Sequence, residues 1–134
     1  MNSFDWKSSY SVGSKSLDIQ HQKLLQICKR ASEYKCDGSK GSIEAFHSIL
    51  NDLAFYAEKH FETEEDVLRR VGYPLLEQQK QEHDEYSEKL VNFLCDAIAG
   101  TIDRDSLEDF LGKWWVGHIL ESDMQYAGYL QGSV

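Results

Sequence analysis

Metal-capable side chains interrupt the apolar faces of four separate helical stretches along the chain. The set contains four of the five histidines and two acids: His21, His60, Glu64, His83, His118 and Asp123. A buried carboxylate is costly unless it is paired, and a buried imidazole needs a partner for each nitrogen. The same faces carry no matching set of cations. Two metal ions shared by these side chains would satisfy them together, and imidazole with carboxylate favours iron or manganese over magnesium or calcium.

The spacing within each stretch determines which side chains share a face. His60 and Glu64 are four residues apart and therefore lie on one side of an α-helix. His118 and Asp123 are five apart, which separates them by about 140° on a regular helix. A π-bulge between them would bring both to one side, so we expect one there. His47 lies roughly 140° around its helix from His60, so we expect it to face outward and to take no part in the site.

Four long stretches of helical periodicity must position these residues. Apolar residues recur at helical spacing within each stretch, and glycines or the single proline separate the stretches. The predicted helices cover residues 17–34, 42–71, 74–99 and 105–130, with Pro74 in the first position of the third. No segment shows the alternation of a strand. We therefore expect an all-α domain, an up-down-up-down antiparallel four-helix bundle that spans residues 1–134.

The composition narrows the partners and the compartment. The chain has 134 residues and a net charge of −9, which argues against nucleic acid and anionic membranes as partners. No apolar run approaches the length of a membrane span, and the N-terminal arm (residues 1–15) lacks a signal peptide's apolar stretch. We expect Phe4, Trp6 and Tyr10 to hold this arm on the bundle. The protein is therefore expected to be cytoplasmic.

The three cysteines form no CxxC pair and are expected to be free thiols of a reducing compartment. Cys28 and Cys95 are expected in the core, and Cys36, in a polar stretch, is expected to be exposed.

Several segments together resemble one known family. They are Leu17-Asp-Ile-Gln-His21, His60-Phe-Glu-Thr-Glu64-Glu65, Tyr73-Pro74, His83, and Trp114-Trp-Val-Gly-His118-Ile119 with Asp123, together with the early Trp6. The chain resembles the hemerythrins, and in particular the bacterial hemerythrin-like domains, along essentially its whole length. The resemblance implies a four-helix bundle that holds a non-haem di-iron centre and binds O2. It also implies an oxo or hydroxo bridge between the two irons.

The resemblance assigns a role to each candidate ligand. It implies that the four histidines named above are terminal iron ligands and that Glu64 and Asp123 are bridging carboxylates. The family's usual third-helix histidine pair is incomplete, because Gln79 stands four residues before His83. Two six-coordinate irons need about 12 bonds, and this ligand set leaves a position open on each iron. Water, a weakly bound Gln79 amide oxygen or an exogenous ligand would fill the extra position.

A second departure concerns the O2 pocket. Trp115 stands where related domains commonly have leucine, beside that pocket. Its larger indole would narrow or redirect access to the iron, or would simply fill the core.

The predicted function is a sensory or regulatory domain of a bacterial signalling protein that binds O2 or responds to redox state. A fused or associated signalling output module would be its partner. Free-standing O2 storage or delivery is the first alternative, and a di-iron oxidase or peroxidase the second. The enzyme is less favoured because the one Glu-x-x-His pair, Glu44 with His47, lies on the wrong face. The other nearby groups, Glu65 and Tyr86, are expected to be exposed or structural, and the buried carboxylates disfavour a metal-free bundle.

Overall fold

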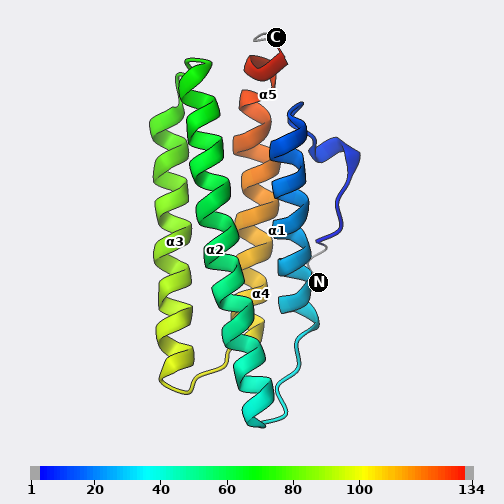
Figure 1. Ribbon diagram of the computed structural model, residues 1–134, viewed down its shortest axis with the longest axis vertical. Coiled ribbons are helices and arrows are strands. Elements are labelled where there is room, and N and C mark those ends of the chain that lie inside the picture. The colour runs from blue at the N-terminus through cyan, green and yellow to red at the C-terminus, as the bar shows by residue number, and fades with distance from the viewer. Residues whose placement is uncertain (1–3, 132–134) are drawn as a thin grey trace.

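The chain folds into an antiparallel bundle of four long helices, as the sequence predicted. The computed structural model describes residues 4–131, and none of these forms a β-strand. Figure 1 shows the helices side by side, with the N-terminal arm running along the outside of α1. The helical segments are Ser8–Tyr10 (a 3-10 turn), α1 Lys15–Glu33, α2 Lys40–Arg70, α3 Leu76–Ile98, α4 Arg104–Leu111 and α5 Met124–Gln131. Two π-helical turns, Gly112–Val116 and His118–Asp123, join α4 to α5 in one continuous rod.

Polar side chains fix where three of the helices begin. Ser14, Ser39 and Asp103 each accept a hydrogen bond from the backbone N–H three residues further on. This satisfies one of the N–H groups that the first turn of a helix leaves free. Because of these caps, α1 and α2 each start two residues before the predicted position, and α4 starts one residue before it.

The turn between α2 and α3 differs from the prediction. Gly72 adopts a left-handed conformation (φ 69°), and the Tyr73 N–H donates to the Leu68 carbonyl at 3.0 Å, which closes the end of α2. The Leu76 N–H then donates to the Tyr73 carbonyl at 3.3 Å. Pro74 therefore occupies the second position of a β-turn, which its fixed φ favours. The prediction that it opens the third helix was wrong, because α3 begins two residues later, at Leu76.

Aromatic residues and a hydrogen bond attach the N-terminal arm to the bundle. Phe4 and Tyr10 of the arm are buried and Trp6 is half-buried, which confirms that aromatic residues attach the arm. The Val12 N–H donates to the Asp18 carboxylate at 3.0 Å, which ties the arm to α1.

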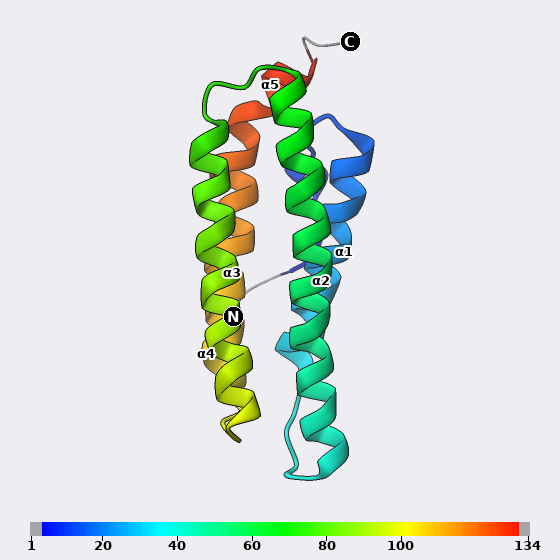
Figure 2. The same cartoon turned by 60° about the vertical axis from the view of Figure 1, so that its left-hand side comes forward.

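Figure 2 shows the two ends of the bundle, with the α2–α3 turn at the same end as α5. None of the helices among residues 4–131 is both long and apolar enough to cross a membrane.

The structure confirms the predicted burial of one cysteine and the predicted exposure of another, but not the predicted burial of the third. Cys28 is buried and Cys36 is exposed, as expected. Cys95 is exposed, so its placement in the core was wrong. It lies five residues after the buried Leu90 and two before the buried Ala97, which turns it to the outer side of α3.

Candidate metal centre

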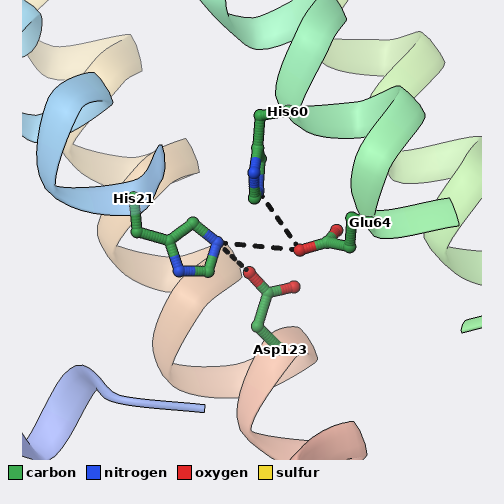
Figure 3. Close-up of side chains that lie close together, drawn as sticks. All are labelled: His21, His60, Glu64 and Asp123. Atoms are coloured by element: carbon green, nitrogen blue, oxygen red, sulfur yellow. Dashed lines mark ion pairs between the residues drawn. The ribbon is translucent and has the colours of Figure 1, made fainter. Parts of the chain in front are cut away.

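The six predicted ligands converge inside the bundle from all four helices. α1 contributes His21, α2 contributes His60 and Glu64, and α3 contributes His83. His118 and Asp123 come from the rod that joins α4 to α5. All six side chains are buried, and His118, the most accessible, is only 5% exposed. Figure 3 shows the part of the cluster formed by His21, His60, Glu64 and Asp123.

The fourth helix reaches this arrangement through a π-turn. His118–Asp123 is π-helical, which confirms the bulge expected from the five-residue spacing. A regular α-turn would have pointed one of the two side chains away from the centre. The preceding π-turn, Gly112–Val116, was not predicted, because it follows no unusual spacing of polar residues.

The Glu64 carboxylate lies between two pairs of histidines. Its Oε2 lies 3.2 Å from Nε2 of His60 and 3.6 Å from Nε2 of His21. Its Oε1 lies 2.8 Å from Nε2 of His83 and 3.7 Å from Nε2 of His118. We call these pairs the His21/His60 half and the His83/His118 half. Each half therefore has its own oxygen of this one carboxylate.

The Asp123 carboxylate also directs one oxygen to each half. Its Oδ2 lies 3.1 Å from Nε2 of His21, and its Oδ1 lies 2.9 Å from Nε2 of His118. Potential ligand atoms fall into two groups, each within 4.8 Å: one of His21, His60, Glu64 and Asp123, the other of Glu64, His83 and His118. Glu64 belongs to both groups, so the geometry is that of a paired site.

Unpaired polar atoms in this cluster fit metal ions. Nine buried side-chain atoms lack a hydrogen bond among the residues that the structure describes, and four of them are inner atoms of the predicted ligands: Nε2 of His21, of His60 and of His118, and Oδ2 of Asp123. Burying such groups without partners is costly. All four belong to residues of the two groups above, so two cations would supply the missing partners. Two imidazoles and two carboxylate oxygens in each half form a donor set that suits iron.

Gln79 lies beside the centre but presents its amide nitrogen to it. The side chain is 2% exposed, and its Nε2 donates to Oδ1 of Asp123 at 3.3 Å and to the Ser122 carbonyl at 3.2 Å. In this orientation the amide holds the aspartate in place. Its oxygen, which would be the ligand atom, makes no hydrogen bond to the described residues.

Trp115 lies between the centre and the aromatic core. Its ring is fully buried, 6.1 Å from that of His60 and 5.7 Å from that of Phe61 (centroid distances). Phe61 in turn stacks on His83 at 3.9 Å. His47, by contrast, is half-buried on α2 and contacts the Ala97 carbonyl at 3.3 Å, away from the cluster. It takes no part in the centre, although it is less exposed than the sequence suggested.

Outer contacts hold the histidines and Glu64 in place. The Tyr126 hydroxyl donates to Oε2 of Glu64 at 2.7 Å. Three ring nitrogens that face away from the centre lie near polar side chains: His60 near Gln20, His83 near Glu65, and His118 near Glu82. Sequence reasoning missed Gln20, Glu82 and Tyr126. The one available signal was Tyr126, a polar group on the inner face three residues after Asp123.

Electrostatics inside the cluster favour the charged forms of several groups. Burial alone would lower the pKa of His21, but the neighbouring carboxylates of Asp123 and Glu64 outweigh it and raise that pKa to about 9. The pKa of His118 is also raised, again against burial, mainly by Asp123. Burial lowers the pKa of His60. Although burial opposes it, the surrounding histidines hold the pKa of Glu64 well below its usual value. The metal-free centre therefore holds protons that metal ions would displace.

The free energy of unfolding of the metal-free protein is expected to fall as pH rises from 6.5 to about 9. Across this range the folded state keeps a proton on His21 that the unfolded state has released, so this stabilisation is complete below pH 6.5 and is lost by pH 9. The loss should reach up to about 3 kcal/mol. Urea denaturation in the presence of a chelator at several pH values measures it. The His21→Gln variant should show a shallower decline, and an equal slope in both proteins would contradict the assignment.

Comparisons with known proteins match the chain to one family. The family model described as "Hemerythrin HHE cation binding domain" matches residues 12–130. A bacteriohemerythrin of Clostridium acetobutylicum is 33% identical over 126 residues, which cover 92% of this chain and 98% of that protein. A hemerythrin-like protein of Naegleria gruberi is 31% identical over 127 residues, which cover 95% of this chain and 93% of that protein.

Solved structures support the fold independently. A wild-type hemerythrin superposes with a TM-score of 0.84 at 22% sequence identity, over 94% of this chain and 96% of that one. A leucine-to-alanine mutant of hemerythrin gives a TM-score of 0.86, also at 22% identity, over 97% and 98%. The fold, the buried histidine–carboxylate cluster and the sequence match agree, and the chain belongs to the hemerythrin family.

Proposed function

We propose that this domain holds two iron ions between its two histidine pairs and reports O2 or redox state as a regulatory domain of a bacterial cytoplasmic signalling protein. The four histidines would be terminal ligands, and Glu64 and Asp123 would bridge the two metal positions. When bound, the iron pair supplies a binding position and electrons for O2. An output module, fused or associated, would read the resulting change.

One observation carries this proposal: both carboxylates direct one oxygen to each histidine pair. A single ion would use one side of Glu64 and leave the other histidine pair without a partner. Two ions use all four carboxylate oxygens, whose distances to the histidine nitrogens run from 2.8 to 3.7 Å. The arrangement therefore supports a dinuclear centre over a mononuclear one.

The protein's own residues shape and dry the site. The phenol of Tyr126 fixes Glu64, and Gln79 fixes Asp123, so both bridging groups are oriented before a ligand arrives. Phe61 and Trp115 pack against histidines of opposite halves and limit the entry of water. Because each helix contributes at least one ligand, a change at the two metal positions is transmitted to all four helices.

The composition of the two halves favours a sensor over a carrier. A carrier releases O2 unchanged and therefore must keep water and protons away from both irons. Gln79 stands where the family usually has a histidine ligand, so an iron held by His83 and His118 would have one ligand fewer, and a water molecule that enters the site could bind there. Exchangeable water promotes irreversible oxidation, which suits a protein that registers O2 rather than one that stores it.

The test is the visible spectrum of the reduced, iron-loaded protein during exposure to O2. We expect about two irons per chain by metal analysis and rapid passage to the diferric state. A long-lived oxygenated form would favour O2 storage or delivery, and turnover with peroxide and a reductant would favour an oxidase or peroxidase. Fewer than two irons after anaerobic reconstitution would contradict the dinuclear proposal.

Replacement of Trp115 by leucine is expected to speed the reaction of the reduced protein with O2 by about tenfold, which corresponds to ~1.4 kcal/mol of barrier. The fully buried indole fills the space beside His60, and a smaller side chain opens a path to that half. Stopped-flow absorbance measures the rate. Trp6→Leu, on the half-buried arm, is the matched control and should leave the rate unchanged. An unchanged rate in Trp115→Leu would mean that the indole is ordinary core.

A further inference from the structure

The two halves of the centre match in their inner ligands but differ in what supports them from outside. Each half has two imidazoles and one oxygen from each bridging carboxylate. On one side, the outward Nδ1 of His60 donates to Oε1 of Gln20, a neutral amide, at 2.8 Å. On the other, Nδ1 of His83 donates to the Glu65 carboxylate at 2.8 Å. The same nitrogen of His118 lies 3.9 Å from the Glu82 carboxylate.

The surfaces that reach the two halves also differ in charge. A groove of about 550 Å³ between α2 and α3 reaches His83. Its charged lining residues are all acidic: Glu58, Glu62, Glu65 and Asp84. A smaller groove of about 280 Å³ between α1 and α2 reaches His60, and its charged lining residues are both basic: Lys23 and Lys59. The His83/His118 half therefore lies in the more negative surroundings, both in the partners of its histidines and in the groove that reaches it, with Glu65 contributing to both.

We propose that the two metal positions are electrically unequal, and that the His83/His118 half binds its cation more tightly and holds the more readily oxidised iron. Glu65 acts as a positioning residue through His83, and Glu82 adds a negative charge 3.9 Å from Nδ1 of His118. This inference rests on the proposed dinuclear function. It adds a polarity, by which we mean that the two metal positions differ in affinity and in ease of oxidation.

The physical reason lies in the outer nitrogens of the histidines. A carboxylate that accepts from the outward N–H of a ligand histidine fixes the ring and makes its other nitrogen a stronger donor. Loss of such a partner costs roughly 10- to 100-fold in metal affinity. A stronger donor stabilises the higher charge of an oxidised metal.

The polarity also bears on the glutamine at position 79. The half that lacks the family's usual extra histidine is the half with two carboxylates behind its remaining histidines. Glu82 is itself held by the Ser122 hydroxyl, which donates to its Oε1 at 2.6 Å. These outer charges offset the missing ligand, so the proposal predicts that this half fills first despite having no third imidazole.

An anaerobic titration of the metal-free full chain with Co2+, against a competing chelating dye, tests the inference. Wild-type protein should bind two ions in two distinguishable steps. Glu65→Gln keeps a hydrogen-bond acceptor but removes the charge, and it should weaken the tighter step 10- to 100-fold. Glu88→Gln removes an exposed charge of α3 that lines neither groove, and both steps should stay as they are in wild type.

The reciprocal variant assigns the steps to the two halves. Gln20→Glu places a carboxylate behind His60 and should strengthen the weaker step about tenfold, which brings the two steps together. The Glu65→Gln Glu82→Gln double variant, loaded with iron, should show its first oxidation at a more positive potential than wild type. A purely structural role for these acids would leave that potential unchanged.

The outcomes separate this inference from the proposed function. Fewer than two Co2+ ions in wild type would overturn the dinuclear function itself. Two ions in wild type, with a tighter step that Glu65→Gln leaves unchanged, would overturn the polarity alone. A Glu65→Gln effect confined to the weaker step, or an equal effect from Glu88→Gln, would overturn it as well.

Discussion

Replacement of Glu64 by glutamine is expected to abolish tight binding of a metal pair. The side chain is fully buried, each of its oxygens faces a different histidine pair, and an amide cannot offer two anionic oxygens. Removal of one partner from a buried charged group costs about 3–5 kcal/mol, or roughly 10²- to 10⁴-fold in affinity. Calorimetric titration with Fe2+ under anaerobic conditions measures the change.

The control for this variant is Glu62→Gln, two residues away and exposed on the same helix. It removes the same charge without touching the centre, so it should bind two ions like wild type. Thermal unfolding without metal checks that both variants remain folded. Two tightly bound ions in Glu64→Gln would show that this carboxylate does not join the two positions.

Replacement of Gln79 by histidine is expected to slow the passage of the reduced iron protein to the diferric state in air by about tenfold or more, or at least ~1.4 kcal/mol of barrier. The new imidazole would occupy the position that water can reach in the His83/His118 half. It would also displace the hydrogen bonds that the amide donates to Asp123 and Ser122. The change in visible absorbance after mixing with air-saturated buffer gives the rate.

Gln78→His is the matched control, because Gln78 is exposed beside Gln79 on α3. It adds the same side chain outside the centre and should leave the rate as in wild type. An unchanged or faster rate in Gln79→His would mean that an open position in this half does not govern oxidation. The argument that favours a sensor over an O2 carrier would then lose its support from position 79.

The sequence predicted the bundle and the six clustered residues because both depend on periodicity along single helices. His60 and Glu64 share a face for reasons that involve no other part of the chain. The π-turn was equally accessible, since the five-residue spacing of His118 and Asp123 fits one helical side only if the turn widens. Buried polar groups on an otherwise apolar stripe are rare enough to mark a site.

The outer contacts were not predictable in this way. Gln20 and Glu82 lie on the flanks of their helices, where a polar residue ordinarily faces solvent. Their partners are 40 and 36 residues away along the chain, at His60 and His118, so these contacts depend on how whole helices lie against one another. The start of α3 at Leu76 rather than at Pro74 was also missed, because a β-turn over residues 73–76 precedes the helix. The position of a turn depends on how the preceding helix ends.

The π-turn at His118–Asp123 also contains one residue more than an α-helical turn between the same two ends would need. An ordinary α-turn would join the same two ends with one residue fewer, because a π-bulge is an α-helix with a residue added. Loss of a single codon here would let the turn tighten, and Tyr126 beyond it would keep its side of the rod. The same loss inside α1 or α2 would rotate everything downstream by about 100°. A one-residue deletion between His118 and Asp123 is therefore expected to preserve the centre, whereas one in the regular helices around it is not.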